Sequence, residues 1–257
     1  MGIVSQRTAE NEQLAKKLEQ LHEESPDKGY RRLNDDLRHD CGIHVNDKRV
    51  LRICRARDIR STVKYNNRGC TRQAKNPQYL AENLLDRQFY AAKPNEKWLT
   101  DVTEFKWYED FVVHKMYLSA ILDLYDRRIV SFVMSERNDN PLVFKTFDKA
   151  IKANPDAHPR FHSDRGVQYT NRKFHHKLKK QGMTQSMSRV AHCIDNGPME
   201  GFWGILKREM YYGRRFTSKW ELMRSIEAYM YYYNHKRVQR NLGILTPMEK
   251  HTLYVAA

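Results

Sequence analysis

The chain is short of cysteine and of long apolar runs. Only 4 of its 257 residues are cysteines, and no two of them form a Cys-x-x-Cys pair. Scattered cysteines are typical of free thiols in a reducing compartment and argue against a disulfide-stabilised secreted domain. No apolar run approaches the roughly 18 residues that a transmembrane helix needs, and the first residues contain no apolar segment of a secretory signal. We therefore expect a cytoplasmic protein that does not span a membrane.

Acidic residues are also scarce relative to basic ones. The chain has 31 Asp and Glu against 46 Lys and Arg, a net charge of +15. This balance indicates a polyanionic partner, of which nucleic acid is the commonest. A basic protein on a membrane surface is the alternative, but no long basic amphipathic helix supports it. The expected partner is therefore DNA or RNA.

Three helices are predicted before the first strand. An apolar stripe with i, i+4, i+7 spacing predicts a helix over 8–24, and too few heptads are present for a dimeric coiled coil. A second helix is expected over 29–41, ended by Gly42 in the C′ position. Asn46 is a suitable N-cap for a third. Helix, short glycine-containing turn and helix is the outline of a helix-turn-helix.

A basic tract begins in the third predicted helix. From Lys48 to Lys75 the chain has ten basic residues and one acid, Asp58. Such a tract is either a solvated surface or a set of phosphate contacts, and its charge excess favours the second interpretation. The candidate DNA-contacting residues on the helix are Lys48, Arg49, Arg52 and Arg55. We expect residues 1–75 to form a helical DNA-contacting region.

The pattern then changes from helices to strands. Residues 76–93 are expected to be a linker, with a short helix within 76–97, before a catalytic core over 94–257. β-Branched and aromatic residues in short apolar runs predict an α/β fold with a mixed sheet flanked by helices. The expected strands are 98–108, 112–125, 127–135, 160–163 and 183–187, and the expected helices are 140–153, 171–181, 196–211 and 219–234.

Three acidic residues stand out in this basic chain. Asp101 lies within an apolar strand, Asp164 at the end of a later strand, and Glu200 in the first turns of a helix. Each alone could be a surface, turn-forming or helix-capping acid. Together they suit two Mg²⁺ ions acting on a phosphodiester, because hard divalent cations prefer oxygen ligands.

The spacing of these acids and their flanking motifs resemble one known family. There are 35 residues between Asp164 and Glu200, and Lys207 follows Glu200 by seven. The matching segments are Gly29–Leu33, Val45–Val50, Trp98–Glu104, His162–Tyr169, Ser186–Arg189, Cys193–Asn196, Met199–Glu209, Tyr233–Arg237 and Leu245–Met248. The chain resembles transposases of the insertion-sequence-three group, specifically their second reading-frame product. Their DDE catalytic core is also found in retroviral integrases. Gly197, Gly201 and Trp203 stand where Ala, Ser and Phe are usual.

The resemblance implies a ribonuclease-H-like core that holds two Mg²⁺ (or Mn²⁺) ions. Asp101 would bridge the ions, and Asp164 and Glu200 would each hold one. Lys207 and Arg189 would contact DNA. The implied reaction is cleavage at insertion-sequence ends and transfer of the freed 3′-hydroxyl to another strand.

The resemblance also implies the partners. They are transposon-end and target DNA, further copies of the chain on DNA, and the upstream reading-frame product, often as a fusion. The implied place is the bacterial cytoplasm, on the nucleoid. A non-catalytic DNA-binding regulator and a nuclease on the same fold remain the alternatives.

Overall fold

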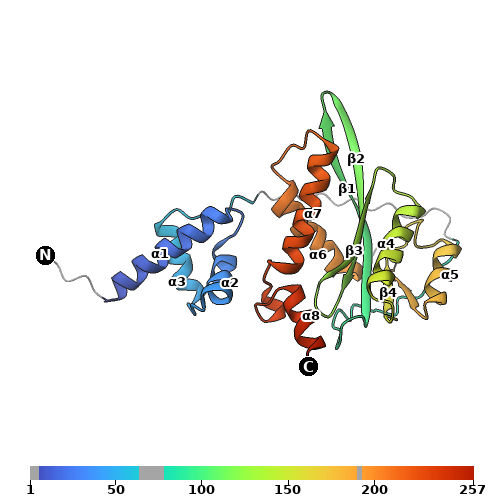
Figure 1. Ribbon diagram of the computed structural model, residues 1–257, viewed down its shortest axis with the longest axis horizontal. Helices are drawn as coiled ribbons and strands as arrows, with labels where there is room; N and C mark the ends of the chain where they lie inside the picture. Colours follow the sequence, from blue (N-terminus) through green and yellow to red (C-terminus); the bar gives the residue numbers. More distant parts are fainter. Residues whose placement is uncertain (1–5, 64–77, 190–192) are drawn as a thin grey trace.

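The computed structural model describes residues 6–63, 78–189 and 193–257 (Figure 1). Three helices come first: α1 (Gln6–Glu24), α2 (Tyr30–Cys41) and α3 (Asp47–Ala56). A five-stranded sheet with helices on both faces follows. None of the helices in these described ranges is long and apolar enough to span a bilayer.

The first three helices form a small domain with its own core. The predicted apolar stripe of α1 packs on α2 and α3, so that Leu14, Leu18, Leu33 and Leu37 are buried together. Both predicted helix boundaries are confirmed. Gly42 adopts φ 65° and donates its N–H to Leu37, whereas the Asn46 side chain accepts from the N–H of Lys48.

The sheet is mixed, as the strand pattern predicts. Its strands are β1 (Lys97–Glu109), β2 (Val112–Asp123), β3 (Ile129–Ser135), β4 (Arg160–Ser163) and β5 (Thr184–Met187). Their order is β3-β2-β1-β4-β5. The first three strands are an antiparallel meander, and β4 and β5 are added in parallel beside β1. The predicted mixed α/β layer fold is therefore confirmed.

Helices cover both faces of the sheet (Figure 1). On one face, α4 (Asn140–Ala153) and α5 (Arg172–Lys180) bury a cluster that includes Trp98, Phe147 and Phe161. On the other, α6 (Gly197–Leu206) and α7 (Lys219–His235) bury Leu99, Phe105 and their neighbours. The remaining elements are the 3₁₀ turns η1 (Cys193–Asn196) and η3 (Arg240–Leu242), the π-helical turn η2 (Lys207–Tyr211) and α8 (Pro247–Val255).

Two helical predictions need correction. The short helix expected within 76–97 is absent from residues 78–96, because their N–H groups bond elsewhere: those of Leu84 and Leu85 donate to the Ser186 hydroxyl beside β5. The single helix expected over 196–211 is instead a 3₁₀ turn, an α-helix and a π-helical turn in succession. The divisions at residues 75 and 93 stay predictions, since residues 64–77 lie outside the description.

The helical domain contacts the C-terminal helices through ion pairs. Arg32 of α2 pairs with Glu209 at 2.9 Å and donates to the Tyr232 hydroxyl at 2.7 Å. Arg240 pairs with Asp35 at 2.7 Å and with Asp47 at 2.8 Å. The helix α2 and Asp47 at the start of α3 therefore dock on the core, whereas Lys48, Arg52 and Arg55 of α3 are exposed.

Two glycines with open surroundings should respond oppositely to alanine. A Cβ on Gly201 in α6, or on Gly42, would meet no atom within 4 Å. Gly201→Ala should raise the free energy of unfolding by about 0.5–1 kcal/mol, because glycine weakens a helix interior. Gly42→Ala should lower it by about 1–2 kcal/mol, because φ 65° strains an L-residue. Urea denaturation of the two variants checks the signs, and two changes of the same sign would contradict this account.

Candidate active site

The pairing of β1 with β4 brings two of the acids side by side. Leu99 is in register with His162 on the parallel neighbour. Two residues further along each chain come Asp101 and Asp164, and adjacent strands lie about 4.8 Å apart. Asp101 thus lies in the middle of the sheet, and Asp164 comes directly after β4 ends at Ser163. Glu200 approaches from α6, in the layer that covers β1.

Hydrogen bonds hold the Asp101 carboxylate in place. Its Oδ1 accepts the N–H of Val102 at 2.8 Å, and its Oδ2 accepts the indole N–H of Trp203 at 3.0 Å. Trp203 comes from α6, the helix that carries Glu200. A phenylalanine, usual at this position in the resembling family, could not donate this bond. The tryptophan therefore links Asp101 to the Glu200 helix as well as packing on the sheet.

Asp164 is held by the turn that follows it. Its Oδ1 accepts the N–H of Gly166 at 2.8 Å. A Cβ on Gly166 would lie 3.0 Å from that same oxygen, closer than side-chain packing normally permits. The glycine in the Asp-Arg-Gly sequence is therefore needed for close approach to the carboxylate.

The three carboxylates lie within one another's electric field. Burial, followed by the charge of Asp164 and then that of Glu200, raises the pKa of Asp101 well above its usual range. Burial raises the pKa of Asp164. Glu200 is an exposed residue. Desolvation and the charge of Asp164 nevertheless raise the pKa of its carboxyl. Like charges so placed favour a bound cation or a proton.

The donor chemistry of this site suits Mg²⁺ or Mn²⁺. Carboxylate oxygens are hard ligands, and the mutual repulsion of these three would be relieved by a divalent cation. As they stand, no three His, Cys, Asp or Glu side chains in residues 6–63, 78–189 and 193–257 form a cluster that could hold an ion. The assignment of two ions to these acids remains a prediction.

His162, in the motif of the second acid, has a structural place. Its ring nitrogens lie 2.9 Å from the Ser186 hydroxyl and 3.1 Å from that of Ser188. Burial lowers the pKa of His162 to about 4, so the imidazole is neutral near pH 7. This histidine joins β4 to β5 and does not face solvent.

The predicted DNA-contacting residues fall into two regions. Lys48, Arg52 and Arg55 are exposed on α3, whereas the Arg49 guanidinium bonds to Glu10 and Asn11 of α1. Lys207 opens the π-helical turn, and its Nζ lies 5.4 Å from the centre of the Phe105 ring. Arg189 is bound to Asp195. The distal part of the basic tract, from residue 64 to 75, lies outside the description.

Asp195 and Asn196 precede α6 but bond to other segments. Neither side chain caps the helix. The Asn196 amide donates to the carbonyl of Thr100 at 3.2 Å, and Asp195 accepts from arginines. Thr100 and Arg87 are about a hundred residues away, so local spacing gave no signal of them, whereas Arg189 lies only six residues before Asp195.

Comparison with known proteins identifies the family. Two family profiles described as Integrase core domain match residues 91–193 and 200–252, and one described as HTH-like domain matches residues 9–66. The InsK protein of element IS150 of Escherichia coli is 38% identical over 91% of this chain and 81% of its own length. Transposase InsF of IS3A of Escherichia coli is 32% identical over 77% of this chain and 66% of its own length.

The chain belongs to the insertion-sequence transposases. The predicted resemblance to the insertion-sequence-three group is confirmed, and with it the ribonuclease-H-like class of the core. Among solved structures, the HTLV-2 integrase catalytic core domain in complex with magnesium aligns with a TM-score of 0.48 and 18% identity, covering 62% of this chain and 98% of that one.

The burial of Asp164 in this transposase predicts a pH-dependent loss of stability. Because the pKa of Asp164 is raised on folding, the unfolded chain loses that proton at a lower pH than the folded one. Ionisation therefore costs stability as pH rises above about 4, the ordinary value for Asp. Asp164→Asn keeps an oxygen for Gly166 but removes the charge.

We expect Asp164→Asn, without divalent cations, to raise the free energy of unfolding at about pH 8, because the variant no longer holds a buried charge at this position. The gain should shrink toward about pH 4. Urea denaturation at the two pH values measures it. Asp156→Asn, at an exposed position, is the control and should change stability by less than about 0.5 kcal/mol. Equal gains at both pH values would refute the electrostatic origin.

Proposed function

We propose that this transposase cuts DNA at insertion-sequence ends and joins the freed 3′-hydroxyl to another strand by metal-dependent phosphoryl transfer. The observation that carries the proposal is the alignment of Asp101 with Asp164 by the pairing of β1 with β4, with Glu200 on the helix that covers β1 and a raised pKa at each of the three. Carboxylates near one another can hold the divalent cations that phosphoryl transfer uses, and the basic surface around them attracts a polyanionic substrate.

The residues have distinct tasks in this proposal. Asp101, fixed by Val102 and Trp203, would hold both ions, while Asp164 and Glu200 would each hold one. When bound, the ions would activate the attacking oxygen and stabilise the leaving one. Lys207, beyond the end of α6, would bind the DNA backbone near the reacting phosphate.

The helical domain would bind DNA through α3. Lys48, Arg52 and Arg55 are exposed there, and α2 is occupied by its contacts with the core. A bound duplex would thus meet the core and the helical domain together. We further propose that several copies act on one DNA complex in the cytoplasm, on the nucleoid, with or fused to the upstream reading-frame product.

Glu200→Gln tests the catalytic assignment. With labelled, pre-cut element ends and Mg²⁺ or Mn²⁺, we expect the variant to lose cleavage and strand transfer while keeping nearly the wild-type affinity for DNA. Glu227→Gln, an equal change at an exposed site on α7, is the control and should remain active.

The alternatives give different products. Full activity of Glu200→Gln would refute its role. If the wild type binds DNA but makes no product even with the upstream fusion, the chain is a regulator. Cleavage of unrelated DNA without joining would identify a nuclease.

A second test concerns α3. Each lost phosphate contact lowers the slope of log affinity against log salt by about 0.9. Arg52→Gln combined with Arg55→Gln should therefore weaken DNA binding and reduce the slope by about 2. Arg57→Gln is the control, because Arg57 already pairs with Glu12 and Glu19 in α1. An unchanged slope in the double variant would exclude this face of α3 as a phosphate contact.

A further inference from the structure

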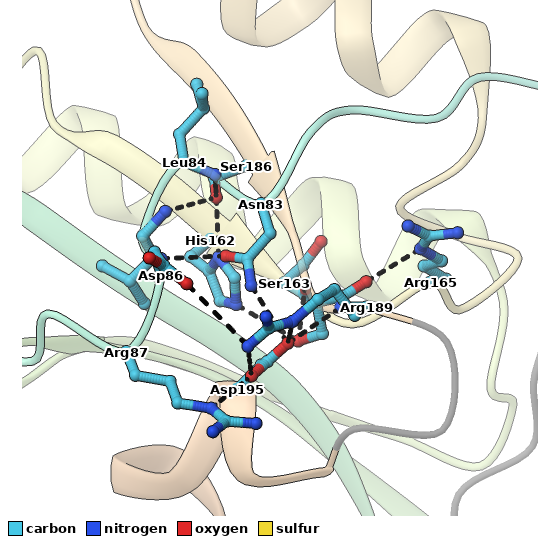
Figure 2. Close-up of polar contacts among 12 residues, drawn as sticks. Asn83, Leu84, Asp86, Arg87, His162, Ser163, Arg165, Ser186, Arg189 and Asp195 are labelled. Atoms are coloured by element: carbon cyan, nitrogen blue, oxygen red, sulfur yellow. Dashed lines mark hydrogen bonds and ion pairs between the residues drawn. The ribbon is translucent and has the colours of Figure 1, made fainter.

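Asp195 is the centre of a charge cluster in which the carboxylate is buried while the side chains of Arg87 and Arg189 remain partly exposed (Figure 2). The residue is 0% exposed. Its Oδ1 accepts from Arg87 Nε and Arg189 Nη2, each at 2.9 Å. Its Oδ2 accepts from Arg189 Nε at 2.9 Å and from the Arg189 N–H and Asn83 Nδ2 at 3.0 Å. We call Asn83, Arg87, Arg189 and Asp195 the Asp195 cluster.

These bonds make Asp195 unsuitable as a metal ligand. Five donors occupy its two oxygens, which offer about four lone-pair positions. Two guanidinium groups balance its charge and lower the pKa of its carboxyl. A buried carboxylate satisfied so completely fixes the positions of the chain segments that supply its partners.

The cluster is linked directly to each segment that carries an acid. Asp195 lies in η1, which runs straight into α6 and its Glu200. The next residue, Asn196, donates to the carbonyl of Thr100, beside Asp101. These two links start at the consecutive residues Asp195 and Asn196, so a movement of Asp195 would displace both Glu200 and Asp101.

The link to Asp164 passes through Ser188, which precedes Arg189. The N–H of Ser188 donates to the Ser163 carbonyl at 2.9 Å, and the Ser188 carbonyl accepts from Arg165 Nε at 2.8 Å. Ser163 and Arg165 flank Asp164 on both sides. The cluster therefore holds together neighbours of all three acids, although those acids repel one another.

We propose that Asp195 and Arg189 are positioning residues for the metal-binding carboxylates, and that their pairing holds Glu200 within reach of Asp101 and Asp164. This inference rests on the proposed function. It gives Arg189 a role within the protein, in place of the DNA contact expected from the resemblance. Loss of groups that orient metal ligands typically weakens metal affinity by about 10–100-fold.

The test measures Mn²⁺ binding to the full chain without DNA. Electron paramagnetic resonance reports the concentration of free Mn²⁺ during the titration. The Mn²⁺ binding that disappears in Asp101→Asn is assigned to the site formed by the three acids. Asp195→Asn should then weaken that binding about tenfold or more, with an unchanged circular dichroism spectrum. Arg189→Gln should do the same, and it also serves if Asp195→Asn fails to fold.

Asp126→Asn is the matched control. Asp126 is also 0% exposed and bonds to Arg128 and His251, but it contacts none of the three segments that carry the acids. Its variant should keep wild-type Mn²⁺ affinity.

In strand transfer, raised Mn²⁺ should restore the turnover of Asp195→Asn with little change in the KM for DNA, which a general loss of folding would not allow.

Three results would overturn the inference. Folded Asp195→Asn and Arg189→Gln variants with wild-type Mn²⁺ affinity would exclude positioning. An Arg189→Gln variant that loses DNA affinity but not Mn²⁺ affinity would show that Arg189 is a DNA contact. If Asp101→Asn leaves the Mn²⁺ binding of the wild type unchanged, the proposed metal site itself is wrong, and the inference is wrong with it.

Discussion

The parallel pairing of β1 with β4 is the constraint on which the site depends. Only three residue pairs form it, and Leu99 with His162 sets the register that aligns Asp101 with Asp164. Because side chains alternate along a strand, a slip of one residue would turn one of these acids away from the other. Trp98 and Leu99, both fully buried, anchor the register from opposite faces of the sheet.

The core must therefore tolerate an unfavourable charge arrangement at its centre. Burial raises the pKa values of Asp101 and Asp164, and repulsion by Asp164 and Glu200 raises that of Asp101 further, which means that the folded protein holds these charges at a cost. The surrounding bonds limit movement without neutralising the charge: peptide N–H groups and the Trp203 indole donate to the carboxylates. At Asp195, by contrast, two arginines cancel the charge of the carboxylate. The negative charges of Asp101 and Asp164 therefore destabilise the fold, whereas the charge of nearby Asp195 is compensated by arginines.

Local patterns predicted the elements better than the contacts between them. The cap at Asn46, the turn at Gly42 and the strand alternation depend on neighbours in the sequence, and each was predictable. The path of residues 78–96 was not, because it depends on distant partners: the N–H groups of Leu84 and Leu85 bond to Ser186, about a hundred residues later. The same holds for the Trp203 bond to Asp101, and for the place of Arg189, whose sequence context resembled a DNA-contact motif. The three acids could be proposed from spacing and family resemblance, whereas the hydrogen bonds around them required the fold.

The order of the strands also has a consequence for synthesis of the protein. The antiparallel meander of β1, β2 and β3 is contiguous in sequence and brings only Asp101 into place. Asp164 joins it when β4 pairs with β1 at the edge of the meander, and Glu200 only when α6 has covered the sheet. Such non-local pairing is slow compared with hairpin formation. A chain still emerging from the ribosome therefore presents at most a part of the carboxylate set to the nucleic acid around it.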